Sequence, residues 1–170
     1  MSRIHVCPLS QVPSIVKAVG ARSLVTLINQ DTPVVRPREI APDRHLFIAV
    51  SDIVAATDGH IVPAETHVDD LLGFVRQWDR AEPLLIHCYA GVSRSTAAAF
   101  IAACALNPER QEEEIARAIR RHSPTATPNA KLVAIADAIL GRSGRMTAAV
   151  EKIGQGHSCF EGVPFALDLQ

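Results

Sequence analysis

Apolar residues recur along the chain in two spacings that alternate with each other. Short apolar or β-branched runs of strand length predict strands at residues 3–7, 23–28, 45–50 and 83–87. Longer stretches with apolar residues at helical spacing predict helices at residues 13–19, 63–81, 95–106, 107–122, 130–140 and 147–153. Strands interleaved with helices indicate an α/β fold, with a central, mostly parallel sheet of about four to five strands flanked by helices.

Turn-forming residues set the boundaries of these elements. Asn107 followed by Pro108 is a typical start for the fourth helix, and Gly141 stops the fifth. We therefore assign residues 1–141 to one domain and residues 142–170 to a C-terminal tail whose packing stays open. Sheets of this kind bind ligands beyond the carboxyl ends of their parallel strands, so we expect a site at that edge.

Composition restricts the partners more than the fold. The 170-residue chain is 48% apolar with a net charge of −1, so no general attraction to nucleic acid or anionic membrane is expected. No apolar run approaches the ~20 residues that span a bilayer, and the start lacks the apolar region of a signal peptide. We expect a soluble, cytoplasmic protein that binds neither nucleic acid nor membrane, and we leave its oligomeric state open.

The cysteines and histidines give no metal-binding pattern. The cysteines, none at CxxC spacing, are Cys7, Cys88, Cys104 and Cys159. Neither a zinc knuckle nor a thioredoxin-type motif is therefore indicated, and the histidines also lack the spacing of metal ligands. We expect no metal and no cofactor. Cys7 and Cys104 are interpreted as buried, inert residues, whereas Cys88 requires its own explanation.

Cys88 lies in a loop, HCYAGVSRS at residues 87–95, between a predicted strand and a predicted helix. Backbone N–H groups that converge at such a helix N-terminus form an anion site. Gly91 permits a backbone conformation that a side chain would oppose, and the planar guanidinium of Arg94 can bind two phosphate oxygens. The same positive surroundings favour the thiolate form of Cys88. A thiolate beneath a bound phosphate indicates nucleophilic phosphoryl transfer.

These residues resemble the phosphate-binding loop of the cysteine-based protein tyrosine phosphatases, which reads HCxxGxxR followed by Ser or Thr. Residues 23–29 and 45–52 resemble two strands of that family, and residues 127–129, TPN, resemble a turn behind the loop in its small dual-specificity-like members. The resemblance covers about residues 1–141 and implies the family's fold. It is specific because the loop has His before the cysteine, Gly within and Ser after the arginine.

The resemblance also implies roles for the residues of the loop. Cys88 would attack phosphorus to form a cysteinyl-phosphate, Arg94 would hold the phosphate oxygens, and Ser95 would assist departure of the thiolate. His87 would structure the loop and favour the thiolate without touching substrate. Besides Cys88, Arg94 and Ser95, the phosphate-binding loop would consist of His87, Tyr89, Ala90, Gly91, Val92 and Ser93.

The resemblance implies an aspartic acid that protonates the leaving group and then activates water. Asp52 directly follows the strand at residues 45–50, where the family places this acid. Asp58, beside Gly59 in the same loop, is the alternative. We expect Asp52 to be the general acid and interpret Asp58 as a turn residue.

These features together predict a protein tyrosine phosphatase, with dual specificity left open, that hydrolyses a phosphorylated protein or a small phosphomonoester. A reactive thiolate would also make the enzyme sensitive to oxidation. The alternative function is a catalytically weak, phosphate-binding pseudophosphatase that acts as an interaction module. Arg36, Arg38 and Arg44 could line the pocket, but we interpret them as solvated loop residues.

Overall fold

The computed structural model describes residues 2–169, in which five strands form a single sheet. Their order across the sheet is β3–β2–β4–β1–β5. The strands are β1 (Arg3–Pro8), β2 (Ser23–Ile28), β3 (His45–Ala49), β4 (Leu84–Cys88) and β5 (Phe165–Asp168). Strands β1 to β4 pair in parallel, and β5 pairs antiparallel with β1. The predicted α/β fold with a mostly parallel sheet is confirmed.

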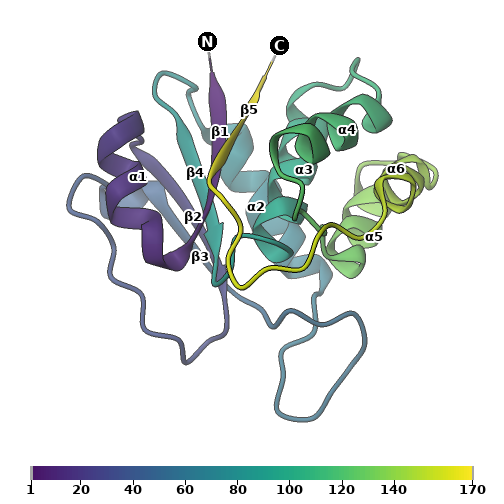
Figure 1. Ribbon diagram of the computed structural model, residues 1–170, viewed down its shortest axis with the longest axis horizontal. Coiled ribbons are helices and arrows are strands. Elements are labelled where there is room, and N and C mark those ends of the chain that lie inside the picture. The colour runs from purple at the N-terminus through teal and green to yellow at the C-terminus, as the bar shows by residue number, and fades with distance from the viewer. Residues whose placement is uncertain (1, 170) are drawn as a thin grey trace.

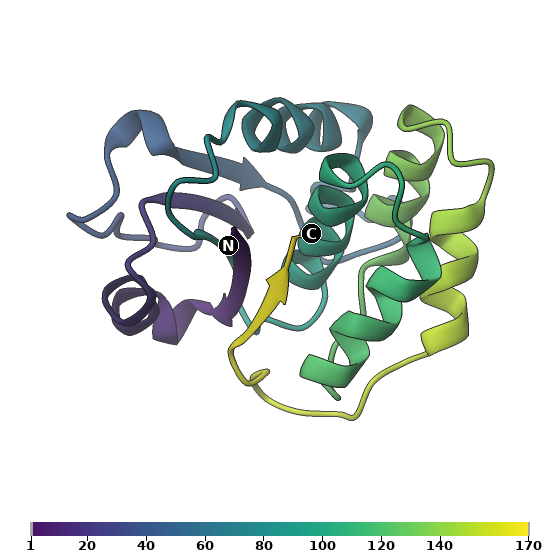
Figure 2. The same cartoon turned by 90° about the horizontal axis from the view of Figure 1, so that it is seen from above.

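Helices cover both faces of this sheet (Figures 1 and 2). Helix α1 (Val12–Val19) lies on one face by itself. The helices on the other face are α2 (Glu65–Gln77), α3 (Arg94–Leu106), α4 (Glu112–His122), α5 (Ala130–Ile139) and α6 (Arg145–Ile153). Short 3-10 turns, η1 (Leu9–Gln11) and η2 (Pro42–Arg44), precede α1 and β3.

The centre of the molecule is β4 followed by α3. Every residue of β4 is buried, because the strand lies between β1 and β2 and is covered by helices on both faces. Helix α3 is buried from Arg94 to Cys104, and its alanines allow α2, α4 and α5 to approach closely. The connection between these two buried elements, residues 89–93, is thereby held rigidly at the carboxyl edge of the sheet.

Two predicted helices have wrong boundaries. Asn107 does not begin the fourth helix: its side-chain amide donates to the Ala103 carbonyl at 2.9 Å, so it ends α3 instead. Residues 107–111 form a turn, and α4 begins at Glu112. The helix predicted at residues 63–81 is shorter at both ends, because Ala64 before it and Trp78 after it have extended backbones (ψ 167° and 122°).

Residues 142–170, for which the sequence left the packing open, contain two elements of the fold. Helix α6 packs on α4 and α5, and β5 extends the sheet beside β1 (Figure 1). Leu167 of β5 and Met146 of α6 are buried. Within residues 2–169, none of the helices combines the length and the apolar character needed to span a membrane.

Candidate active site

The Cys88 thiol lies at the carboxyl end of the central strand, at the bottom of the loop that follows it. Cys88 is the last residue of β4, and only 2% of its surface is exposed. The Gly91 N–H donates to Cys88 Sγ at 3.2 Å, and Ser95 Oγ lies 3.1 Å from the same sulfur. Both contacts stabilise negative charge on sulfur, since a thiolate can only accept.

Gly91 allows the loop to close around the sulfur. Its φ is +71°, and a Cβ at this position would lie 2.7 Å from the backbone N of Pro8. Only glycine fits, because both the backbone conformation and the space beside β1 exclude a side chain. The Leu9 N–H also donates to the Tyr89 carbonyl at 3.0 Å, so β1 and the residues after it support the loop from below.

Arg94, the first residue of α3, is 7% exposed and is held in one orientation. Its Nη1 donates to Asn29 Oδ1 at 2.7 Å and to the Val50 carbonyl at 3.0 Å. Its Nε is buried and has no hydrogen-bond partner among residues 2–169. A buried N–H without a partner is costly unless a ligand satisfies it. The arrangement therefore suits an oxyanion that binds the remaining side of the guanidinium.

His87 is part of a buried hydrogen-bond chain. Burial lowers the pKa of His87 to about 4, so the ring is neutral near pH 7. Nδ1 lies 3.0 Å from the Cys88 carbonyl, which can only accept, so Nδ1 carries the proton. Nε2 then accepts from Thr26 Oγ1 at 2.7 Å, and Thr26 in turn accepts from His45 Nε2 at 2.8 Å. These hydrogen bonds fix the backbone of Cys88, and the His87 ring itself is fully buried.

Asp52 lies beside the loop, whereas Asp58 does not contact it. Asp52 Oδ1 accepts from Ser93 Oγ at 2.7 Å and from Asn129 Nδ2 at 2.9 Å. Asp58 is exposed, next to Gly59, and makes no side-chain hydrogen bond or ion pair within the described residues. Of the two aspartates predicted from the sequence, Asp52 is the one that the fold brings to the loop.

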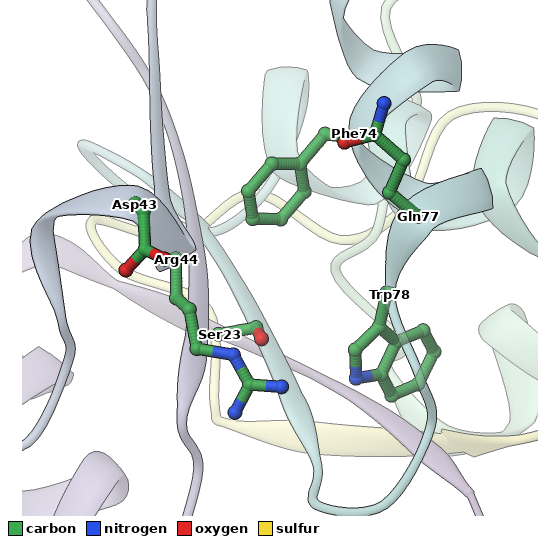
Figure 3. Close-up of a pocket in the computed structure, with 6 residues that line it drawn as sticks. All are labelled: Ser23, Asp43, Arg44, Phe74, Gln77 and Trp78. Carbon is green, nitrogen blue, oxygen red and sulfur yellow. The ribbon is translucent and has the colours of Figure 1, made fainter.

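Arg44, one of the three arginines considered for the pocket wall, lies apart from the loop that contains Cys88. Arg44 pairs with Asp79 at 2.5 Å and with Glu82 at 3.3 Å. It lines a cavity of about 160 Å³ with Phe74 and Trp78 (Figure 3). Arg44 precedes β3, so this cavity is at the opposite edge of the sheet from Cys88.

The other two cysteines of the interior have a structural environment. Cys7 on β1 and Cys104 on α3 are fully enclosed. Burial raises the pKa of Cys7 and of Cys104 to about 12, so both remain thiols at neutral pH. Cys159, by contrast, is exposed.

Three residues that support the site were not predicted from the sequence. Asn29 positions Arg94, Thr26 links the two histidines, and Asn129 contacts Asp52. Asn29 follows the second predicted strand, so the rule that ligands bind at the carboxyl ends of strands could have identified it. Thr26 lies inside a strand and gives no comparable signal, because its partners are distant in sequence.

The fold and the loop together define the class of protein that the chain is similar to. A solved structure of DUSP15 matches with a TM-score of 0.62 at 18% identity, over 91% of this chain and 94% of DUSP15. Human DUSP28 matches with a TM-score of 0.61 at 16% identity, over 82% of this chain and 94% of DUSP28. The chain thus has the fold of the small dual-specificity phosphatases, as the resemblance of residues 87–95 implied.

A further solved structure with this fold is that of the human tyrosine phosphatase-like serine/threonine/tyrosine-interacting protein. It matches with a TM-score of 0.61 at 15% identity, over 82% of this chain and 92% of that protein. No model of a known protein family matches the chain, and neither does any curated protein sequence. At such identities the similarity establishes the fold, and the chemistry has to be argued from the site.

Proposed function

We propose that the protein is a cysteine-dependent phosphomonoester hydrolase that acts on protein phosphotyrosine, with dual specificity left open. One observation carries the proposal: the partly satisfied guanidinium of Arg94 lies in the same loop as a sulfur that both the Gly91 N–H and the Ser95 hydroxyl contact. The Nε of Arg120 is also buried without a partner, so the argument depends on the place of Arg94 in the loop that holds the sulfur. A structural cysteine would need neither Gly91 nor Ser95 beside its sulfur.

In the first step, the Cys88 thiolate attacks phosphorus, and the bond from phosphorus to the ester oxygen breaks. Asp52 gives its proton to that oxygen, which leaves as an alcohol. Arg94 and the N–H groups of the loop hold the other phosphate oxygens. In the second step, water attacks the cysteinyl-phosphate and Asp52 takes the proton from it. The S–P bond breaks, and Ser95 Oγ–H stabilises the departing thiolate.

Hydrolysis of phosphotyrosine and p-nitrophenyl phosphate across pH, in EDTA, tests this proposal. We expect Cys88→Ser to abolish turnover of both substrates. Asp52→Asn should lower kcat by about 10²-fold and remove the basic limb of the pH profile. The loss of kcat should be larger for phosphotyrosine than for p-nitrophenyl phosphate, because the phenol of tyrosine leaves less readily than p-nitrophenol without a proton. Asp58→Asn is the matched control and should behave as the wild type.

The alternative function is a phosphate-docking module without turnover. A reduced wild-type protein that is inert toward both substrates but binds vanadate or phosphate would establish it. The contacts of Asp52 with Ser93 and Asn129 favour the enzyme, because a docking module has no use for a carboxylate held beside the loop. The same thiolate would make the enzyme lose activity in peroxide and recover it in a thiol reductant.

A further inference from the structure

The segment at residues 154–164 links α6 to β5 and is here called the strap. It crosses the carboxyl edge of the sheet, where β4 ends, before the chain turns up into β5 beside β1 (Figure 1, yellow). The strap has no regular secondary structure, yet it passes beside the loop that contains Cys88.

Hydrogen bonds fix the strap to the active-site loop and its surroundings. The Gly162 N–H donates to the Ala90 carbonyl at 2.8 Å, within the catalytic loop itself. The Gly156 N–H donates to Thr127 Oγ1 at 3.0 Å. Ser10 Oγ donates to Glu161 Oε1 at 2.9 Å, which joins the strap to η1. The strap is therefore a built wall of the site and not a loose connection.

The glycines of the strap lie where its backbone meets other backbone. A Cβ on Gly162 would be 2.8 Å from the Gly91 carbonyl oxygen, and a Cβ on Gly156 would be 2.5 Å from the Thr125 carbonyl carbon. Both distances are too short for a side chain, so only glycine permits this approach. Glycine thus lets the strap approach the loop at Gly162 and residues 125–126 at Gly156, on the two sides of residues 157–161.

The strap and the loop present apolar side chains to solvent beside the nucleophile. Tyr89, next to Cys88, is 51% exposed, and Phe160 and Val163, on either side of residues 161–162, are 83% and 74% exposed. Val163 and Tyr89 are chain neighbours of Gly162 and Ala90, which bond each other, and Phe160 follows Cys159, which lines the cavity described next. Single exposed apolar residues are ordinary, but several on neighbouring segments mark a surface that binds a partner. We call Tyr89, Phe160 and Val163 the apolar rim.

A cavity of about 310 Å³ lies between the strap and the catalytic residues. Asp52, Ser93 and Thr127 line one side of it, and residues 155–159 of the strap line the other. This space adjoins the phosphate loop but is outside it, so a phosphoryl group bound by Arg94 would leave it available. A substrate that uses both the cavity and the rim must extend beyond its phosphorylated residue.

We propose that the strap is the substrate-recognition wall of this site, and that its occupant is a phosphorylated polypeptide with apolar side chains next to the phosphorylated residue. The inference rests on the proposed phosphatase function and names its substrate class. A small phosphomonoester would reach Asp52 with its leaving group but has no further side chains to place against the rim or the strap side of the cavity. An anionic membrane is disfavoured because residues 153–170 contain no Lys or Arg to attract it.

The test compares phosphotyrosine peptides that differ only in flanking residues, Leu and Val against Ser and Gly, with p-nitrophenyl phosphate as the small substrate. The variant is Phe160→Ala combined with Val163→Ala, and circular dichroism verifies its fold. The control is Ile139→Ala, an apolar truncation at the end of α5 that lies away from Asn129. Binding of each peptide to Cys88→Ser, with and without the strap substitutions, is measured in parallel.

We expect the wild type to prefer the apolar-flanked peptide by at least tenfold in kcat/KM. In the strap variant this ratio of kcat/KM values should fall at least fivefold, while kcat/KM for p-nitrophenyl phosphate stays near that of the wild type. The control variant should change neither value. An unchanged preference in the strap variant overturns the proposal. Binding of the wild type to anionic vesicles is measured as well, and a strap variant that loses this binding but handles the peptides like the wild type also overturns it. If the wild type turns over nothing, the proposed function fails, and the peptide-binding comparison alone decides the role of the strap.

Discussion

At the scale of single residues, the conformation of the loop that contains Cys88 depends most on Gly91. We predict that Gly91→Ala lowers both activity and stability, because a Cβ there meets the backbone of Cys7 and Pro8 at 2.9 and 2.7 Å. Gly20 is the matched control: its φ of +70° is nearly that of Gly91, but nothing lies within 4 Å of its added Cβ. Gly20→Ala should therefore cost only about 1 kcal/mol, from the backbone conformation.

The measurements are kcat/KM for p-nitrophenyl phosphate and the free energy of unfolding in urea. Gly91→Ala should lose at least about tenfold in activity and more stability than the control, since overpacking typically costs about 1–3 kcal/mol further. If the two variants lost equal activity and equal stability, the backbone of β1 would move easily and the loop would tolerate a side chain at residue 91.

Single residues also show how far the sequence alone could predict the site. Cys88, Arg94 and Ser95 lie in one short stretch, so their meeting follows from a strand, a tight loop and a helix. The residues that orient them come from elsewhere: Asn29 follows β2, and Thr26 lies inside it. Their roles depend on the order of strands in the sheet, which hydrophobic patterning does not specify.

At the scale of elements, the N-terminus of α5 links helix capping to the candidate acid. Asn129 Oδ1 accepts from the N–H groups of Lys131 and Leu132, while its Nδ2 donates to Asp52. Asn129→Ser should retain the cap but lose the amide donor, because Ser caps helices about as well as Asn. We expect near-wild-type stability and a lower kcat for phosphotyrosine.

Asn129→Ala separates the two roles, since it removes the cap as well. This variant should lose about 1 kcal/mol of stability in urea and show a kcat similar to that of the Ser variant. If Asn129→Ser retains full kcat at every pH, the amide does not position Asp52 and serves only α5.

Helices and strands were predicted well where the sequence pattern lies within the element itself. They were predicted poorly where contacts with another element determine the boundary. Strands β1 to β4 and helix α3 were predicted within a residue of their bounds, because each has its signal, an alternating pattern in β1 and an apolar run in the others, within its own residues. The start of α4 was wrong because Asn107 bonds backward to α3. Strand β5 was not predicted, because its four residues, FALD, become a strand only by pairing with β1.

At the scale of the whole molecule, the last part of the chain completes the domain and the site together. Strand β5 covers the edge of β1, and the Arg3–Asp168 pair at 2.6 Å joins the two ends of the described chain. Because β5 pairs with β1, the strap that precedes β5 passes beside the loop that contains Cys88. The residues after Gly141 therefore connect the edge of the sheet to the loop that contains Cys88.

We predict that a fragment of residues 1–141 does not fold cooperatively. Without the rest, β1 becomes an unpaired edge, and the apolar contacts of Met146 and Leu167 are lost. Losing a buried residue of this size typically costs about 2–5 kcal/mol, and Arg142 also bonds the buried Glu112 at 2.8 Å. The sum approaches the total stability of a typical domain, about 5–15 kcal/mol.

Thermal unfolding followed by circular dichroism should show a single transition for the full chain and none for the fragment. A fragment that melts cooperatively within a few degrees of the full chain would instead make residues 142–170 an appendage, with the domain complete at Gly141.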